Sequence, residues 1–170
     1  MNMTIRLAKP GDESGIHEAH MRSVREVCVT DHGPDEIKGW GNRPLGDRWV
    51  KTLQSEMVWV VEKDSVISGY AYIGIYQELS PATGYIHGLY LTPEVLGQGI
   101  GRKLMQLMLD YAKDSAVEIV TLESTITAHE FYKSFGFKDS GPAQKIDICG
   151  HPVTNFSMIL RMNEAAEEKL

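Results

Sequence analysis

Three glycines stand within five positions of the stretch LGQGIGRKLM, residues 96–105. Gly97, Gly99 and Gly101 come directly before a segment whose apolar residues recur at helical spacing. A glycine inside a helix costs about 1 kcal/mol relative to alanine. Either the chain makes a tight turn here, or a ligand approaches the backbone so closely that no Cβ fits between them. Because the first N–H groups of a helix lack partners and favour negative charge, a phosphate is the ligand that this pattern suits.

Two common phosphate-binding motifs do not match this stretch. The dinucleotide fingerprint G-x-G-x-x-G would need its third glycine where Arg102 stands. The Walker A pattern fails because no Gly-Lys-Ser/Thr follows at the required distance. On spacing alone, a structural turn and an anion site are equally supported.

Composition excludes several other classes of function. The formal net charge of −6 does not favour non-specific binding to nucleic acid. The six histidines lack metal-ligand spacing, because His17 and His20 have no evident third ligand, and Cys28 and Cys149 form neither a metal motif nor a disulfide-rich pattern. The first residues lack the apolar stretch of a signal peptide, and no run approaches the ~20 apolar residues that cross a bilayer. We therefore expect a cytoplasmic protein that uses no metal and binds neither nucleic acid nor a membrane.

The elements that must position the glycine stretch alternate between strand and helix patterns. Strands are predicted at 3–8, 57–62, 66–76, 84–91 and 118–124, with one or two more within 147–162. Helices are predicted at 12–31 with Asp12 as N-cap, 46–56, 98–113 and 127–135, while 34–44 forms a short helix or a loop. No repeat or linker divides the chain, so we predict one domain over residues 1–162 and a C-terminal tail, a frayed helix, over 163–170.

Two segments then resemble one known family. The segment LYLTPEVLGQGIGRKLM, residues 89–105, is similar to the acyl-CoA-binding segment of the GNAT superfamily of N-acetyltransferases, which reads Arg/Gln-x-x-Gly-x-Gly/Ala after a strand and a proline turn. Gly99 and Gly101 match, and Leu96 stands where Arg or Gln is usual. TITAHEFYKSFGF, residues 125–137, resembles the second motif, Asn-x-x-Ala-x-x-Phe-Tyr-x-x-x-Gly-Phe, with Thr125 in place of the Asn. The order of elements fits from Met3 to about Met162.

The resemblance implies an α/β fold of the α+β type. It has a mixed, mostly antiparallel central sheet of about six to seven strands, helices on both faces, and two central strands that splay apart. Gly88 within the strand 84–91 suggests a bulge that would help the splay, or else a close packing contact. In the family the pantetheine arm of acetyl-CoA fills the gap between the splayed strands as a false strand. The implied acetyl-CoA-binding residues are Leu89, Tyr90, Leu91, Gln98, Gly99, Ile100, Gly101, Arg102, Thr125, Ala128 and Phe131.

The resemblance also implies a chemistry. Tyr132 is the general acid that protonates the leaving CoA sulfur, although its place on an apolar helix face also suits a core residue. The glutamate that often serves as base is missing, since Tyr85 occupies that region. His87, with an unperturbed pKa near 6.5, is the base that we select, and Glu123, His129 or ordered water are alternatives. The backbone N–H of Leu91 or a neighbour is a candidate donor to the developing oxyanion.

The prediction for the amine that accepts the acetyl group rests on the charge of residues 12–36. Acidic residues outnumber basic ones over residues 12–36, where the family builds its acceptor pocket. An acidic lining suits a cationic amine, whereas a solvated acidic helix face explains the same residues without a ligand. We predict transfer of an acetyl group to a primary amine of a small molecule or peptide through a ternary complex. A non-catalytic acyl-CoA-binding sensor or partner-binding module of the same fold is the alternative, and a homodimer is left open.

Overall fold

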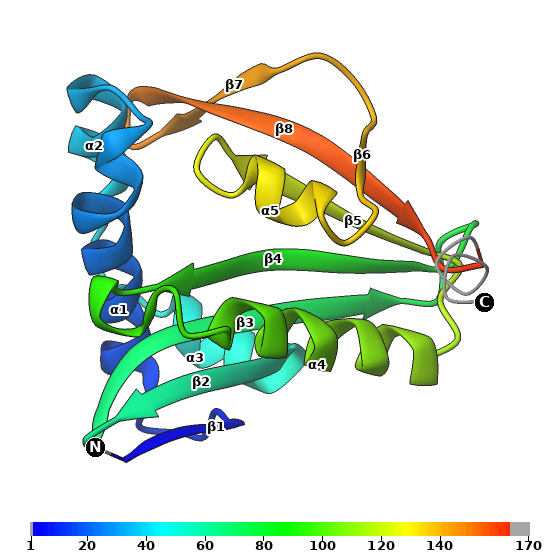
Figure 1. The fold of residues 1–170 in the computed structure, drawn as a ribbon, viewed down its shortest axis with the longest axis horizontal. Coiled ribbons are helices and arrows are strands. Elements are labelled where there is room, and N and C mark those ends of the chain that lie inside the picture. The colour runs from blue at the N-terminus through cyan, green and yellow to red at the C-terminus, as the bar shows by residue number, and fades with distance from the viewer. Residues whose placement is uncertain (1, 164–170) are drawn as a thin grey trace.

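The computed structural model describes residues 2–163, and the expected helical tail from residue 164 onward lies outside them. One mixed sheet runs through the molecule in the order β1-β2-β3-β4-β5-β8-β6, with β7 paired to β8 at the same edge as β6 (Figure 1). Its strands are β1 (Met3–Leu7), β2 (Met57–Lys63), β3 (Val66–Tyr76), β4 (Thr83–Leu91), β5 (Ile119–Thr125), β6 (Lys138–Asp139), β7 (Gln144–Ile148) and β8 (His151–Arg161). The prediction of a mixed, mostly antiparallel sheet is confirmed. The described sheet has eight strands rather than six or seven, because the late segment forms a hairpin and the two-residue β6 joins it.

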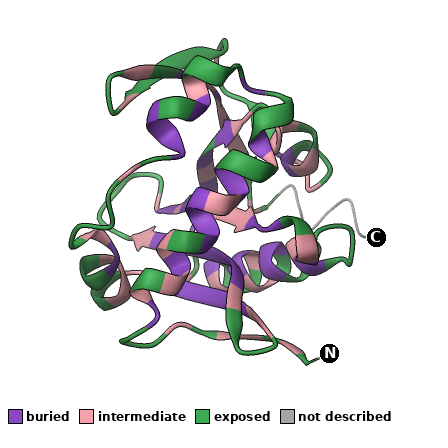
Figure 2. Ribbon diagram, turned by 90° about the vertical axis from the view of Figure 1, so that its left-hand side faces the viewer, coloured by how far each residue is buried: buried purple, intermediate pink, exposed green. Residues whose placement is uncertain are grey.

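Helices cover both faces of this sheet (Figure 1). The helix α4 (Ile100–Asp114) packs on one face, and α1 (Glu13–Glu26) and α3 (Arg48–Ser55) pack on the other. The short α2 (Pro34–Trp40) lies against β8, α5 (His129–Lys133) follows β5, and two single turns, η1 (Cys28–Thr30) and η2 (Pro93–Val95), connect elements. Figure 2 shows that the helices direct buried residues inward and exposed residues outward.

Local sequence explains several of these boundaries. Asp64 and Ser65 both adopt positive φ, as a two-residue turn of type I′ requires, and they join β2 to β3 as the predicted hairpin. Asp12 precedes α1, but its side chain does not cap the helix. Its carboxylate instead accepts hydrogen bonds from the Arg6 guanidinium at 2.7 and 3.1 Å and from the Lys9 N–H at 2.9 Å. Asp12 therefore ties the start of α1 to β1.

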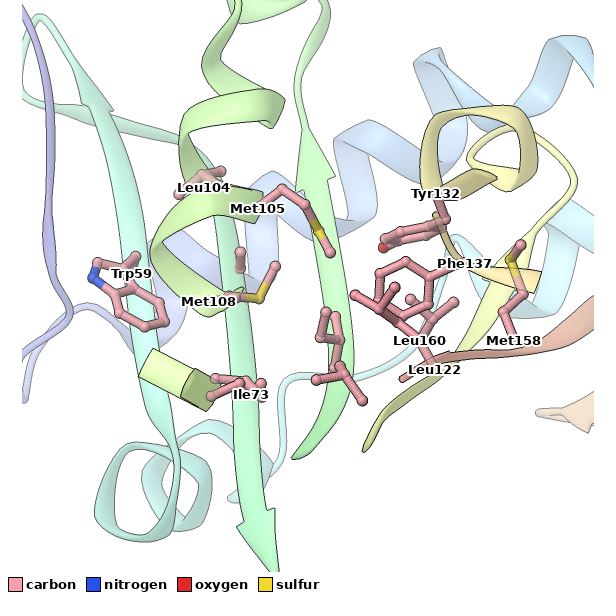
Figure 3. Close-up of a cluster of buried hydrophobic side chains, with 14 of the residues drawn as sticks. Trp59, Ile73, Leu104, Met105, Met108, Leu122, Tyr132, Phe137, Met158 and Leu160 are labelled. Atoms are coloured by element: carbon pink, nitrogen blue, oxygen red, sulfur yellow. The ribbon is translucent and has the colours of Figure 1, made fainter. Parts of the chain in front are cut away.

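The largest core lies between α4 and the sheet. Figure 3 shows Leu104, Met105 and Met108 of α4 beside strand residues, and a second group that includes Tyr132 and Phe137. All of these side chains are buried. The core holds the N-terminal end of α4 against the end of β4, which is where the glycine stretch lies.

The central strands β4 and β5 pair over a short stretch and then separate. They are parallel, and their register runs from Thr83 opposite Ile119 to Ile86 opposite Leu122. Beyond these pairs both strands continue without pairing to each other, and Figure 1 shows them diverging toward the glycine stretch. The predicted splay is therefore present, and it leaves backbone groups of both strands without a neighbouring strand.

A bulge in β4 accompanies the splay. Tyr72 of β3 pairs with Gly88 and Ile73 pairs with Ile86, so His87 is an extra residue with no partner across. The extra residue shifts the alternation of side chains, because Ile86 and Leu91 both belong to the α4 core although they are five positions apart. Consequently His87, before the shift, and Tyr90, after it, both face the α1 and α3 side.

Candidate active site

The glycine stretch forms a turn that opens onto a cavity. Gly97 and Gly99 have φ values of +70° and +74°, in the left-handed region that favours glycine. No protein atom lies within 4 Å of a Cβ built at either position. Gly101 differs, since its Cβ would lie 3.4 Å from the Phe131 ring. Backbone conformation thus explains two of the glycines, whereas a Cβ at Gly101 would make only ordinary van der Waals contacts with α5 and Leu91.

The same turn presents unpaired donors. Gly99 is the N-cap of α4, and its carbonyl accepts the N–H of Lys103 at 3.1 Å. The N–H groups of Ile100, Gly101 and Arg102 precede that first bond and have no partner within the helix. Together with the helix dipole they favour an anion.

A cavity of about 310 Å³ connects this turn to the gap between β4 and β5. It is lined by every residue that the sequence assigns to acetyl-CoA binding except Gln98: Leu89, Tyr90, Leu91, Gly99, Ile100, Gly101, Arg102, Thr125, Ala128 and Phe131. The elements thus bring residues from β4, α4, β5 and α5 to one place. Gln98 is exposed and donates its Nε2–H to the Glu94 carbonyl at 2.9 Å, which stabilises the turn rather than lining the cavity.

Some of the lining could not be predicted from the motifs. Ser23 of α1, and Val27 and Cys28 directly after it, also line the cavity. No local pattern marks them, because their face of α1 is defined only when the helix packs across the sheet. Leu96 and Gly97 also line the cavity, so the residue that replaces the usual Arg or Gln contributes an apolar surface.

Thr125 has a local role at the end of β5. Its Oγ1 accepts the N–H of Ala128 at 3.2 Å. This hydrogen bond fixes the turn from β5 into α5, as a short polar side chain before a helix commonly does. Thr125 therefore orders the backbone that carries Ala128 and Phe131 into the cavity wall.

Tyr132 is a buried residue of α5. Its side chain is 4% exposed and packs edge-on against the rings of Phe131 and Phe137, with centroid distances of 5.5 and 5.9 Å. Tyr132 is absent from the cavity lining, and none of residues 2–163 forms a hydrogen bond with its hydroxyl. Burial raises the pKa of Tyr132, so the phenol carries its proton at neutral pH.

His87 lies on the bulge and belongs to a chain of hydrogen bonds. The hydroxyl of Tyr76 lies 3.1 Å from His87 Nε2 and 3.3 Å from Glu56 Oε1. The imidazole stacks on Tyr72 with centroids 4.9 Å apart and rings 8° from parallel. Burial and the charge of Arg48 lower the pKa of His87, which keeps the ring neutral and able to accept a proton.

Glu56 and Tyr76 are residues that the sequence analysis missed. Glu56 directly follows α3 and lies thirty-one positions before His87, so no spacing in the sequence connects them. Burial raises the pKa of the Glu56 carboxyl, and the hydrogen bond from Tyr76 opposes this shift. The sequence held one indication of this contact, which is the glycine within β3 at position 74. A Cβ at Gly74 would collide with the Glu56 carboxylate and the Tyr76 hydroxyl.

The alternative bases are engaged elsewhere. Glu123 accepts hydrogen bonds from Ser157 at 2.9 Å on the exposed side of β5 and β8. His129 Nε2 lies 2.6 Å from Asp139 Oδ1, and its ring stacks on Phe156 with centroids 4.0 Å apart. Neither residue lines the cavity, and His87 does not line it either.

Several acidic residues over 12–36 contact other side chains instead of lining a cavity. Asp12 binds Arg6, Glu26 binds Arg22, and Glu36 contacts His32 and accepts a hydrogen bond from Thr154. None of the acidic residues over 12–36 lines either of the two main cavities. The expected acidic lining is therefore wrong for these cavities, and the solvated helix face explains most of these residues.

Within residues 2–163, no cluster of three or more His, Cys, Asp or Glu side chains has the geometry to hold a metal ion. No described helix combines the length and the apolar character that crossing a membrane requires.

Comparison with known sequences gives a consistent result. Residues 21–137 match the family model described as acetyltransferase (GNAT) family. The L-amino acid N-acyltransferase MnaT of Escherichia coli is 29% identical over 141 residues, which cover 79% of each chain. The thialysine N-epsilon-acetyltransferase of Sus scrofa is 27% identical over 158 residues, covering 84% of this chain and 88% of the relative.

Comparison with solved structures supports the fold. A GCN5-related N-acetyltransferase from Rhodopseudomonas palustris superposes with a TM-score of 0.79 at 19% identity, covering 95% of this chain and 98% of that one. The PaiA N-acetyltransferase of Thermoplasma acidophilum, solved in complex with coenzyme A, has a TM-score of 0.70 at 18% identity and covers 95% and 99% of the two chains.

Proposed function

Because the chain belongs to the acetyltransferase (GNAT) family, we propose that it transfers an acetyl group from acetyl-CoA to a primary amine of a small molecule or peptide. The two sequence relatives named above are both described as N-acyl- or N-acetyltransferases, which supports a nitrogen acceptor. The observation that carries the proposal is the cavity that joins the β4–β5 gap to the N-terminus of α4. We also propose that the protein acts in the cytoplasm, and a homodimer is left open.

The residues of this cavity fit acetyl-CoA. The free N–H groups of Ile100, Gly101 and Arg102 suit the pyrophosphate, and the open space beside Gly97 and Gly99 leaves room for it. The unpaired edges of β4 and β5 suit an extended, amide-containing arm. When bound there, acetyl-CoA supplies an acetyl thioester whose carbonyl carbon accepts the amine and whose sulfur leaves.

The chain's own groups move the protons and hold the charge. His87 accepts the proton that the amine loses, with Tyr76 and Glu56 fixing the orientation of its ring. The buried phenol of Tyr132 donates a proton to the departing sulfur, so the products are an N-acetylated amine and free CoA thiol. The N–H of Leu91 or a neighbour donates to the carbonyl oxygen as its negative charge grows.

A non-catalytic acyl-CoA-binding module is the second candidate. The features that favour it are Leu96 and Thr125, which depart from the family's motifs, and the absence of a glutamate in the region of Tyr85. Retention of Tyr132 and the hydrogen-bonded His87 favour the enzyme.

The two candidates are separated by measuring thiol release together with product. Purified protein is incubated with acetyl-CoA and a panel of primary amines. Free thiol is measured with a colorimetric thiol reagent, and the acetylated amine is identified by mass spectrometry. If the protein is an acetyltransferase, free thiol and N-acetylated product should form in equal amounts. Tight CoA binding in calorimetry without product from any amine would identify the binding module instead.

A further inference from the structure

A second cavity, of about 250 Å³, lies on the face of the sheet opposite α4. Its walls come from α1, from the segment between α2 and α3, from the first residue of α3 and from the turn between β7 and β8. Two arginines, Arg43 and Arg48, line it beside the apolar residues Met21, Pro44 and Leu45. The cavity is therefore both basic and apolar.

The two arginines lack carboxylate partners. Arg48 is half-buried, it donates one hydrogen bond to the Tyr72 hydroxyl at 2.9 Å, and its guanidinium lies 4.9 Å from the centre of the Trp49 ring. Arg43 forms no ion pair with any acidic side chain of residues 2–163. Asp47 is the one acidic residue in the lining, and it is exposed and pairs with Lys51 at 2.6 Å.

Two other partly buried arginines have the carboxylate partners that Arg43 and Arg48 lack. Arg6 binds the carboxylates of Asp12 and Glu62, and Arg22 binds those of Glu26 and Glu94. A guanidinium has five N–H donors arranged to bind a carboxylate through two parallel hydrogen bonds. Arg43 and Arg48 line a cavity and have no acidic partner among the described residues, so a carboxylate bound there would give each of them one.

The position of Arg48 relates this cavity to the proposed chemistry. Arg48 contacts Tyr72, and Tyr72 stacks on His87. One tyrosine ring therefore separates the guanidinium from the proposed base. His87 itself does not line the cavity, but in an α-amino acid a single carbon joins the amine to the carboxylate, so a carboxylate held at Arg48 would leave the amine within one tyrosine ring of the proposed base.

We propose that Arg43 and Arg48 bind the carboxylate of the acceptor, and that the acceptor is an α-amino acid with a neutral, apolar side chain. This inference rests on the proposed acetyl transfer and names the class of amine that receives the group. Met21, Pro44 and Leu45 supply the contact surface for the side chain. The acceptor needs no second, acidic side chain, because its α-carboxylate already supplies the anionic partner of Arg43 and Arg48.

The test compares amino acids with their own amides. L-Methionine, L-leucine and L-phenylalanine are each assayed beside the corresponding primary amide, which keeps the amine and side chain but removes the charge. The wild-type protein should prefer the acid by about tenfold or more in kcat/KM, mainly through KM, as for loss of a charge-assisted hydrogen-bond pair. Arg43→Gln and Arg48→Gln should each reduce this preference, and Arg48→Lys should restore part of it. Lys113→Gln, which changes a charge on an exposed residue of α4 on the other face of the sheet, should leave the preference unchanged.

The outcomes separate this inference from the proposed function. Acetylation of acids and amides at equal rates would overturn the carboxylate site and leave acetyl transfer standing. If no amine is acetylated, the proposed function falls, and calorimetric titration of L-methionine into the CoA-loaded protein decides the site. Binding that is lost in the double variant Arg43→Gln/Arg48→Gln supports the site, and absence of binding to the wild type overturns it.

Discussion

Tyr132 is placed in the core by its packing and in the chemistry by its motif. Because its hydroxyl has no hydrogen-bond partner among the described residues, Tyr132→Phe should leave the free energy of unfolding nearly unchanged. The variant keeps the ring contacts with Phe131 and Phe137 but has no proton to donate. We expect kcat to fall by about 10²- to 10⁴-fold, with acetyl-CoA affinity near that of the wild type. Steady-state kinetics and calorimetry measure the two quantities, and normal turnover would make Tyr132 a core residue only.

His87 predicts a pH dependence. As a base it must be neutral, so activity should be lost as pH falls through its pKa, which burial and the Arg48 charge place below the ordinary 6.5. His87→Ala should remove this step and slow the reaction by roughly 10²-fold. Arg48→Gln should move the step to higher pH, since it removes a nearby positive charge.

The measurement is kcat/KM from pH 5 to pH 9, and a decarboxylated amine serves as acceptor so that Arg48 has no role in binding it. A His87→Ala variant with the wild-type profile would transfer the role of base to another residue or to water.

At the residue scale, the sequence predicted which motif residues line the cavity, but it did not predict which residues form hydrogen bonds with His87. Nearly all the cavity residues named from the two motifs lie together, because a motif records which backbone positions meet a ligand. Glu56 and Tyr76 were missed, because their contact with His87 depends on how β3 and β4 pair and on the end of α3. The acidic lining was wrong since counting charges does not reveal which of them already have partners.

Among the elements, β4 has the most specific geometry. The bulge at His87 brings Gly88 opposite Tyr72, and a Cβ at Gly88 would lie 3.0 Å from Tyr90 Cε2 and 3.4 Å from Tyr72 Cε1. Gly88→Ala should therefore force these rings to move, with a cost of about 1–3 kcal/mol.

Urea unfolding measures this cost, and Gly141→Ala is the matched control because no atom lies within 4 Å of a Cβ there. Equal stability of the two variants would mean that the rings adjust freely. The interior glycine indicated an irregularity in β4, but which residue is the extra one depends on the register with β3.

The splay of β4 and β5 could not be predicted from either strand alone. Both segments have the apolar alternation of paired strands, and nothing in that pattern indicates that pairing stops after Ile86 and Leu122. The expectation came from the resemblance between motifs. The late hairpin of β7 and β8 was undercounted because its polar first strand has little apolar alternation.

Across the whole molecule, ion pairs hold the α1 side to the sheet and to the loop before α4. Hydrogen bonds from Arg22 lower the pKa of Glu94 from the ordinary 4.5 to about 2, and those from Arg6 lower the pKa of Asp12. A carboxyl whose pKa is lowered by folding stabilises the fold above its unfolded pKa and loses that contribution as pH falls through the folded value. The free energy of unfolding should therefore decrease between about pH 5 and pH 2.

Glu94→Gln should make this decrease shallower, whereas Glu130→Gln, on an exposed residue of α5, should not. Thermal unfolding at a series of pH values measures the slope. A slope unchanged by Glu94→Gln would show that its pairing with Arg22 contributes little to stability.

The central claim for the molecule is that the turn before α4 binds the phosphates of CoA, and substitution at Gly99 tests it most directly. Asn and Asp both tolerate the positive φ of this residue and have nearly the same shape, so they differ mainly by one negative charge. Calorimetry with CoA should find that Gly99→Asp binds roughly tenfold or more weakly than Gly99→Asn, and that the difference narrows at high salt, where a charge is screened within about 3 Å. Equal affinity of the two variants, or no binding of CoA by the wild type, would contradict the account.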